Sequence, residues 1–322
     1  MARADLLIHL VESARGGDDA GVQRTVESLI AEERDKQHHL VADRLEAALQ
    51  QTRDVATFVV PGNHDVPSGL SFVTPRRRLE SLILPEAVRG AVDELIEEQQ
   101  RAEVLRAHGL EPRHRVLLTG PPGNGKTSLA EAIAEALVLP LVVVRYEEVV
   151  GSYLGETAAR LASVFAVARS RRCVLFFDEF DAVAKERGDE HETGEIKRVV
   201  SSLLLQVDAV PSHAIVVAAS NHPELLDRAV HRRFEIRLDL PLPGKASRMA
   251  WYERFVGTLD EPVGMSEDTF SRKTVGASFS QLQDLADDVR RRQVLQPGTS
   301  LKRLLPERLS RWREVSALEA HA

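Results

Sequence analysis

The feature that most constrains this chain is a glycine-rich segment, Gly120–Thr127, with the sequence GPPGNGKT. It fits the pattern of a phosphate-binding loop and lies between an apolar run at 115–120 and helix-forming residues at 128–137. This strand–loop–helix context is the one that the pattern requires. The glycines let backbone N–H groups surround a phosphate, and the beginning of the helix adds the positive end of its dipole. A glycine turn that binds nothing is the alternative, and the Lys-Thr pair at the helix start argues against it.

The loop predicts a nucleoside triphosphate, ATP, and Mg²⁺ as ligands. Lys126 is expected to neutralise the β- and γ-phosphates, and the hydroxyl of Thr127 is expected to bind Mg²⁺. The residues that we expect to contact the nucleotide and its metal are Gly120, Pro121, Pro122, Gly123, Asn124, Gly125, Lys126, Thr127, Ser128 and Asp178.

Two carboxylates, Asp178 and Glu179, follow the apolar run at 173–177. The carboxyl end of a strand in an open α/β sheet is where ligands bind. Asp178 is predicted to support Mg²⁺ together with Thr127, and Glu179 to polarise the attacking water. A solvated acidic turn is the alternative, which the phosphate loop upstream makes less attractive.

The remaining pattern predicts an α/β fold with helical parts on either side. Near-continuous apolar runs alternate with helical segments, which is typical of a parallel sheet covered on both faces. The runs are 115–120, 141–145, 173–177, 214–219 and 235–240. Residues 1–50 show helical stripes of apolar residues, and 51–78 lose this periodicity among several prolines and glycines, which indicates a linker.

The motifs together resemble those of the AAA ATPases over about residues 79–295. Beyond the loop and the carboxylates, VVAASNHPELLDRAVHRRFE resembles the family's second region of homology. That resemblance places Asn221 at the sensor-1 position and Arg232 and Arg233 at the arginine-finger pair. A strand-end cap is the alternative use of Asn221, and an ordinary surface pair is the alternative for the arginines.

Two further segments carry the same resemblance. SYLGETAARL is similar to the pore-loop signature, with Tyr153, Leu154 and Gly155 as its aromatic, aliphatic and glycine positions; a tyrosine packed on its own subunit is the alternative. GASFSQLQDLADDVRRR resembles the lid segment of the family but departs from its Gly-Ala-Asp form, so nucleotide contacts by Gly276, Ser280 or Gln281 stay open.

The resemblance implies four parts: a helical interaction module at 1–50, a linker at 51–78, a large α/β nucleotide-binding subdomain at 79–243 and a helical lid with a C-terminal helix at 244–322. It implies a five-stranded parallel sheet and a ring, usually a hexamer. Asn221 would sense the γ-phosphate, and Arg232 and Arg233 would act on a neighbouring subunit's nucleotide.

The implied activity is Mg²⁺-dependent hydrolysis of ATP to ADP and phosphate, coupled to remodelling, unfolding or translocation of a protein client. An ATP-gated oligomeric switch that regulates a bound effector without translocation is the alternative. The layout resembles bacterial ATPases paired with subtilisin-like proteases, which implies a separate protease or effector bound through residues 1–50.

Composition sets the remaining expectations. The net charge is −7, which makes a nucleic-acid partner unlikely because such surfaces are usually basic. The longest apolar stretch, 137–144, contains a proline and is far shorter than the roughly 20 residues of a membrane helix. One cysteine, Cys173, leaves no internal disulfide. We therefore expect a cytoplasmic protein without a membrane anchor.

Overall fold

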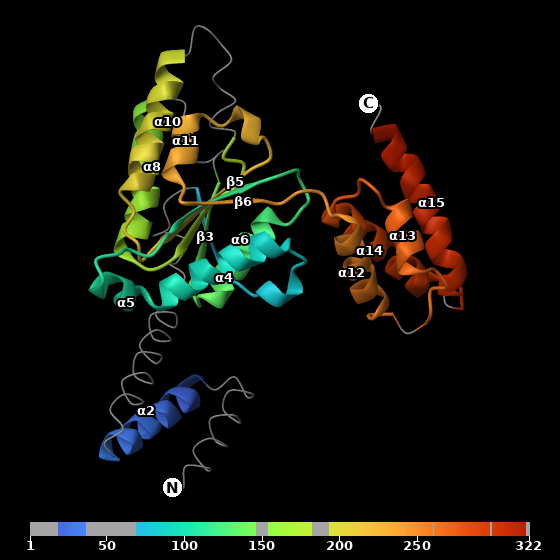
Figure 1. The fold of residues 1–322 in the computed structure, drawn as a ribbon, viewed down its shortest axis with the longest axis horizontal. Coiled ribbons are helices and arrows are strands. Elements are labelled where there is room, and N and C mark those ends of the chain that lie inside the picture. Colours follow the sequence, from blue (N-terminus) through green and yellow to red (C-terminus); the bar gives the residue numbers. More distant parts are fainter. Residues whose placement is uncertain are drawn as a thin grey trace. The chain divides into compact units, whose positions relative to one another are not determined.

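The computed structural model describes residues 19–36, 69–145, 154–181, 193–259, 261–296 and 298–319 (Figure 1). The chain divides into two compact units, Met1–Val66 and Pro67–Ala322. In the first unit, helix α2 spans Asp19–Asp35. Leu29 and Ile30 are buried on this helix, with Val22 and Val26 half-buried beside them, as the predicted apolar stripe requires.

The second unit is built on a six-stranded sheet in the order β1-β3-β4-β5-β2-β6. The predicted α/β class with a mainly parallel sheet is confirmed, because β2 to β6 pair in parallel and coincide with the five apolar runs. The strands are β1 (Leu70–Val73), β2 (Arg115–Thr119), β3 (Leu141–Val144), β4 (Val174–Phe177), β5 (Ile215–Ser220) and β6 (Ile236–Asp239).

The sixth strand corrects the expectation of five. Strand β1 lies inside the segment 51–78 that we expected to be linker, and it pairs antiparallel with β3 from Leu70↔Val144 to Val73↔Leu141. Its sequence, LSFV, is too short to show a periodicity. Leu70 and Phe72 pack against the core, so tertiary contacts hold this strand where local sequence gives no signal.

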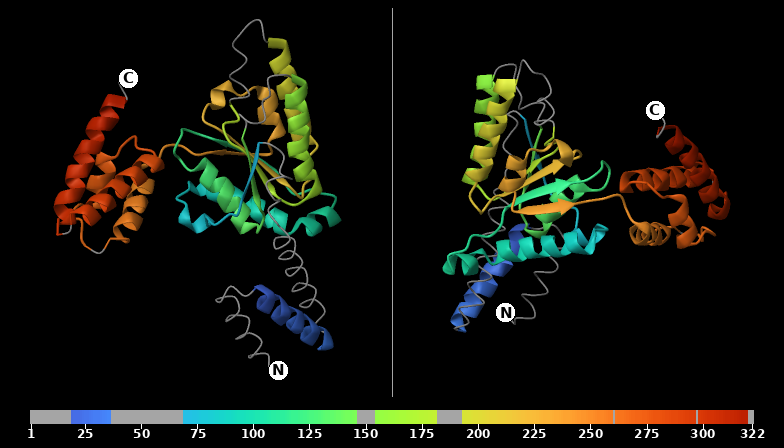
Figure 2. Two further views of the ribbon diagram at one scale, coloured as in Figure 1. Left: turned by 180° about the vertical axis from the view of Figure 1, so that it is seen from behind. Right: turned by 45° about the horizontal axis from the view of Figure 1, so that its top comes forward.

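Helices cover both faces of the sheet, as Figures 1 and 2 show. Helices α8 (Leu154–Ser170), α10 (Thr193–Asp208) and α11 (Arg228–Arg233) pack on one face. Helices α4 (Glu86–Gln100) and α6 (Lys126–Ala136) pack on the other. The short elements are α5 (Ala102–Ala107) and the 3-10 helices η1 (Leu79–Ser81) and η3 (Pro223–Leu225). The buried strands thus separate two apolar layers, which is the expected architecture of a doubly covered sheet.

Four helices after Gly244 form a helical part with an apolar core of its own, which we call the lid after the sequence prediction. They are α12 (Lys245–Val256), α13 (Glu267–Lys273), α14 (Phe279–Leu295) and α15 (Leu301–Glu319). Arg248 is buried at its start, where Nη1 donates to the Pro243 carbonyl (2.5 Å) and Nε to the Ser271 carbonyl (3.0 Å). This arginine fixes α12 to the chain that leaves the sheet. Among the described helices, none is long and apolar enough to cross a membrane.

Candidate nucleotide-binding site

The phosphate loop connects β2 to α6 and is shaped by glycine. Gly120 and Gly123 have φ of +132° and +74°, in the region that other residues rarely adopt. A Cβ on Gly120 would lie 2.2 Å from the Leu240 carbonyl oxygen, so the loop approaches the chain after β6 more closely than any side chain permits. Glycine is required at position 120 because it alone tolerates both the positive φ and the close approach of the Leu240 carbonyl.

Lys126 is held across the mouth of this loop. The residue is only 6% exposed, and Nζ donates to the carbonyls of Gly120 (2.6 Å) and Pro121 (3.0 Å). Burial lowers the pKa of Lys126, while nearby carboxylates, Asp178 first among them, oppose that shift. A cation with little access to water attracts an anion more strongly than a solvated one, which suits a phosphate ligand.

The carboxylate pair contacts the phosphate loop, although 51 positions separate Asp178 from Thr127 in the sequence. The Thr127 hydroxyl donates to Asp178 Oδ2 (3.1 Å), and the backbone N–H of Glu179 donates to Asp178 Oδ1 (3.0 Å). A hydroxyl and a carboxylate in contact form an all-oxygen set of the kind that Mg²⁺ prefers, so these residues fit the expected metal.

Glu179 has an unusual conformation at the same place. Its φ is +51°, which costs energy for a residue with a side chain, and such strain is common at functional sites. Its carboxylate is exposed and makes no hydrogen bond or ion pair with the part of the chain that the structure describes. It is thus available to a water molecule or a ligand.

Asn221 completes the polar side of the site. It follows β5, is half-buried, and its backbone N–H donates to Asp181 Oδ1 (3.3 Å). Asp181 is buried, so the segments after β4 and β5 are tied together behind the cleft. The cleft itself has a volume of about 700 Å³ and is lined by Asn221, Asp178, Glu179 and the loop residues Pro122–Ser128.

More than half of the residues that line the cleft come from parts of the chain where the sequence indicated, among the lining residues, only Ser280 as a candidate contact. They belong to residues 74–84, which we call the arm, and to the lid, from α12, the turn after it and α14. The lining residues concerned are Arg77, Ser81, Leu82, Ile83, Leu84, Trp251, Arg254, Phe255, Thr258, Phe279, Ser280, Gln283, Ala286 and Arg290. The residues of α14 lie within the segment that resembles the family's lid, whereas the arm and the α12 region carry no motif that could have indicated them.

The arm is fixed to α6 and to the lid. The backbone N–H groups of Arg76 and Arg77 donate to Glu131 Oε1 (3.0 and 3.2 Å). Arg254 of α12 donates to the carbonyls of Ser81 (2.8 Å) and Glu80 (3.3 Å). The arm is therefore held in place at both ends, and Arg77 is the one of its arginines that lines the cleft.

The lid segment that we expected to approach the nucleotide contacts the loop directly. The Ser280 N–H donates to the Gly123 carbonyl (2.9 Å), and Ser280 lines the cleft. Gln281 instead caps α14, where it exchanges hydrogen bonds with Ser278 (2.9 and 3.2 Å). Gly276 has a φ of +84° and is not among the lining residues. Of the three candidates, Ser280 is the one at the cleft.

The arginine pair lies elsewhere. Arg232 and Arg233 end α11, just before β6 begins at Ile236, whereas the phosphate loop follows the opposite end of the neighbouring parallel strand β2. Neither arginine lines the cleft. The predicted pore-loop residue Tyr153 lies outside the described residues. Leu154 and Gly155 begin α8, and the structure does not describe the side chain of Leu154.

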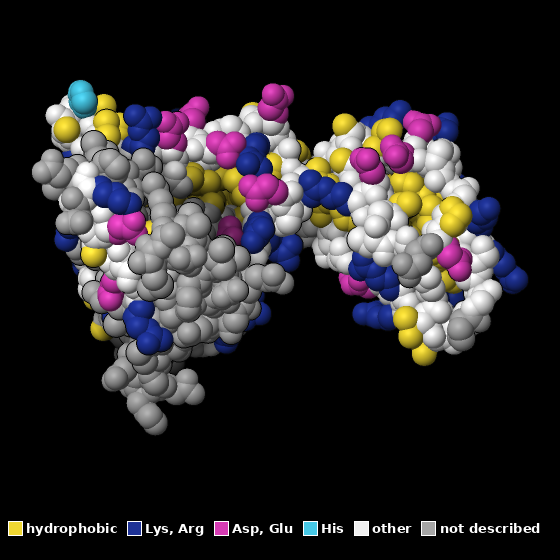
Figure 3. Space-filling model, turned by 90° about the horizontal axis from the view of Figure 1, so that it is seen from below, with side chains coloured by type: hydrophobic (Ala, Val, Ile, Leu, Met, Phe, Trp, Pro, Cys, Tyr) yellow, Lys and Arg dark blue, Asp and Glu magenta, His cyan; other side chains and the backbone are white. Residues whose placement is uncertain are grey.

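Charged side chains of both signs lie on the described surface. On the described part of the face in Figure 3, basic and acidic side chains are interspersed over both the sheet domain and the lid. A nucleic-acid groove usually requires a continuous basic stripe. The described part of the face in Figure 3 shows no such continuous stripe.

Comparison with known proteins gives a consistent match. The model of the "ATPase family associated with various cellular activities (AAA)" matches residues 116–242. An uncharacterized AAA family ATPase of Sinorhizobium fredii is 38% identical over 242 residues, which cover 73% of this chain and 73% of that protein.

Two longer proteins match in part. A putative 26S proteasome regulatory subunit homolog of Methanothermobacter marburgensis is 32% identical over 176 residues, 54% of this chain and 47% of that protein. The ATP-dependent zinc metalloprotease FtsH 3 of Sphaerobacter thermophilus is 34% identical over 221 residues, 63% of this chain and 45% of that protein. The matches to these two relatives span somewhat less than half of their length.

Proposed function

The chain belongs to the AAA family of ATPases, and on that basis we propose that it hydrolyses ATP to ADP and phosphate with Mg²⁺ as cofactor. The observation that carries the proposal is the hydrogen bond between Thr127 and Asp178 (3.1 Å), which unites the phosphate loop with the carboxylates. Lys126, buried at the loop, holds the β- and γ-phosphates, and Thr127 with Asp178 holds the metal. When bound, Mg²⁺ neutralises charge on the phosphate oxygens.

Glu179 is the proposed general base. Its exposed carboxylate stands beside Asp178, free of other described side chains, and can accept a proton from the attacking water. Asn221, on the adjacent strand end, orients that water or the γ-phosphate. Both residues line the cleft.

We propose that Arg232 and Arg233 serve the site of a neighbouring subunit in a hexameric ring. They precede β6, a strand of four residues, whose length at about 3.3 Å per residue is roughly 13 Å. This separation from the carboxyl edge, and their absence from the cleft wall, favour action on another subunit's phosphate. Charge stabilisation by an arginine from a neighbour is an effective way to accelerate phosphoryl transfer.

The work done is proposed to be remodelling, unfolding or translocation of a protein client through the ring, with Tyr153, Leu154 and Gly155 gripping the client. Relatives named as a proteasome regulatory subunit homolog and as a metalloprotease support a protein client. A separate protease, of the subtilisin-like class, or another effector is proposed to bind residues 1–50, and the cytoplasm is the proposed location.

The test separates binding from chemistry. Glu179→Gln is expected to bind a fluorescent ATP analogue normally and to lose at least about 100-fold in turnover, since general bases contribute 10²–10⁴-fold. Lys126→Ala is expected to lose affinity, and Glu97→Gln, an exposed glutamate on α4, serves as the matched control. Near-normal turnover in Glu179→Gln would refute the assignment.

The remodelling activity has a separate test. Tyr153→Ala is expected to retain ATP turnover without a client and to lose unfolding of a tagged, folded reporter protein. Normal unfolding by this variant would contradict the grip and favour the alternative, an ATP-gated switch that regulates an effector without translocation.

A further inference from the structure

The two arginines that end α11 have different surroundings. Arg233 forms an ion pair with Asp208, with Nε 2.6 Å from Oδ2, and its side chain is 37% exposed. Arg232 is exposed and has no hydrogen bond or ion pair with any residue that the structure describes. The sequence motif gives Arg232 and Arg233 the same predicted role, but their contacts in the fold differ.

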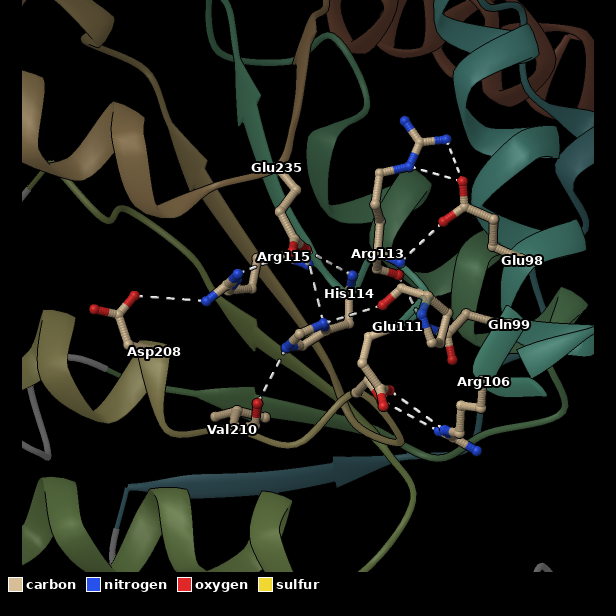
Figure 4. Close-up of polar contacts among 12 residues, drawn as sticks. Glu98, Gln99, Arg106, Glu111, Arg113, His114, Arg115, Asp208, Val210 and Glu235 are labelled. Atoms are coloured by element: carbon tan, nitrogen blue, oxygen red, sulfur yellow. Dashed lines mark hydrogen bonds and ion pairs between the residues drawn. The ribbon is translucent and has the colours of Figure 1, made fainter. Parts of the chain in front are cut away.

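Asp208 belongs to a wider charged network at the amino edge of the sheet (Figure 4). Its Oδ1 lies 3.5 Å from Nη1 of Arg115, whose Nη2 pairs with Glu235 Oε1 at 2.8 Å. Glu235 Oε2 also accepts the backbone N–H groups of His114 (2.9 Å) and Arg115 (3.1 Å). Asp208 is thus held by Arg115, the first residue of β2, as well as by Arg233.

Glu235 and Arg115 of this network are both charged in the folded protein. Partial burial acts to raise the pKa of Glu235, but hydrogen bonds from Arg115 and from the His114 backbone outweigh it, so the pKa lies below its ordinary value. Glu235 therefore stays ionised at neutral pH and keeps Arg115 in place beside Asp208. Asp208, the partner of Arg233, is therefore itself held in position by Arg115.

Helix geometry gives this pair a consequence for Arg232. Successive side chains on an α-helix point about 100° apart, since there are 3.6 residues per turn. When Arg233 is turned toward Asp208 at the end of α10, Arg232 is turned away from it. Helix α11 has six residues: Asp227 caps its beginning, Val230 is buried in the core, and the ion pair between Arg233 and Asp208 joins its last turn to α10.

We infer that the arginine pair divides its work: Arg232 reaches the neighbouring subunit's phosphate, and Arg233 is a positioning residue that acts through Asp208. This inference rests on the proposed function, in which the pair acts on a neighbour. Asp208, which no sequence motif indicates, becomes a residue required for full turnover although it lies far from its own subunit's phosphate loop.

A double-mutant cycle on the full-length protein tests the coupling. Asp208→Asn and Arg233→Gln are each expected to lower kcat about 10-fold with unchanged nucleotide affinity. The double variant is expected to lose no more than either single variant, because each change breaks the ion pair between Arg233 and Asp208. Arg232→Gln is expected to lose about 10³-fold, within the range of arginine fingers. Arg228→Gln, an exposed arginine at the start of the same helix, is the control.

Conservative variants separate positioning from direct contact. Arg233→Lys can still pair with Asp208 and is expected to recover most of the turnover that Arg233→Gln loses, whereas Arg232→Lys is expected to recover little because it lacks the planar fork of donors. Ring assembly by light scattering and the melting temperature are measured for every variant, so that loss of folding is seen directly.

Two outcomes overturn the inference while leaving the proposed function intact. In one, the effects of Asp208→Asn and Arg233→Gln multiply; in the other, Arg233→Gln abolishes turnover and Asp208→Asn does not change it. If Arg232→Gln and Arg233→Gln both behave as Arg228→Gln does, the proposed action of the arginines on a neighbour is itself refuted.

Discussion

Replacement of Gly123 by alanine tests how the lid is joined to the phosphate loop. A Cβ at this position would lie 2.9 Å from both Ser278 Oγ and Ser280 Cβ, at the beginning of α14. Gly125 provides a matched control, since its φ of +88° is equally unfavourable for alanine and nothing lies within 4 Å of its added Cβ. The two variants therefore share the backbone cost and differ in the clash with the lid.

The expected difference follows from these contacts. The left-handed backbone costs roughly 1–2 kcal/mol in each variant. In Gly123→Ala the start of α14 must also move away, and the hydrogen bond from Ser280 to the Gly123 carbonyl (2.9 Å) is weakened, which adds about 0.5–1.5 kcal/mol. We expect Gly123→Ala to melt about 2–4 °C below Gly125→Ala, as an additional loss of about 1 kcal/mol gives for a unit of this size.

Differential scanning fluorimetry with and without ADP, and titration with a fluorescent nucleotide, measure both effects. The lost contact is expected to weaken nucleotide binding about 5-fold more in Gly123→Ala than in Gly125→Ala, because about 1 kcal/mol corresponds to that factor. Equal melting temperatures and equal affinities in the two variants would show that the lid contact does not contribute, and the reasoning would fail.

Three further changes have defined outcomes. Arg254→Ala removes the hydrogen bonds to the Ser81 and Glu80 carbonyls and should weaken nucleotide binding about 5–10-fold, by about 1 kcal/mol or slightly more. Arg272→Ala, on the exposed side of α13, is the control and should not change the affinity. Equal affinities in the two variants would contradict a role for the contact between Arg254 and the arm. The pKa of Glu235 is lowered in the folded state, so the unfolded state binds the proton first as the pH falls. The melting temperature should therefore decrease at pH values under about 5, and this decrease should be smaller in Glu235→Gln. Parallel curves of melting temperature against pH for the two proteins would contradict a contribution of Glu235. Burial raises the pKa of Cys173 to about 12, so iodoacetamide should label it in the unfolded protein and not in the folded one, and rapid labelling of the folded protein would contradict its burial.

The phosphate side of the site could be predicted because its signals are local. The loop, Lys126 and Thr127 occupy one stretch of sequence, and Asp178 and Glu179 end a strand whose apolar run is visible by itself. Parallel strands bring their carboxyl ends to one edge, so the hydrogen bond between Thr127 and Asp178 follows from the fold class.

The resemblance indicated the lid segment around Ser280, but the rest of the other side could not be predicted because its residues come together only in the folded chain. Leu82, Trp251 and Arg290 line one cleft although more than 200 residues separate the first from the last. The division between Arg232 and Arg233 likewise depends on Asp208, on another helix. No spacing in the sequence records such contacts, since they arise from the way packed elements meet.

The edge strand β1 shows where the boundary of the nucleotide-binding unit lies, and two truncations test it. Deletion of residues 1–66 removes the first compact unit as a whole. Deletion of 1–78 also removes β1, its four register pairs with β3, and the backbone donors of Arg76 and Arg77 to Glu131. We expect the shorter deletion to preserve melting temperature, ring assembly and ATP turnover, and to abolish only recruitment of a partner in a pulldown.

The longer deletion is expected to destabilise the protein, because Leu70 and Phe72 leave the core and β3 becomes an exposed edge. Half-burial of these two side chains is worth about 1 kcal/mol each, and loss of the β1 pairing adds to that, so the melting temperature should fall by at least about 4–8 °C. Nucleotide affinity should fall with it, since Arg77 lines the cleft. If deletion of 1–66 already lowers stability and turnover together, the first unit is structural and its proposed role as a recruitment module is wrong. If the protein that lacks 1–78 is as stable as the protein that lacks 1–66, β1 does not contribute to stability and the nucleotide-binding unit begins at the arm.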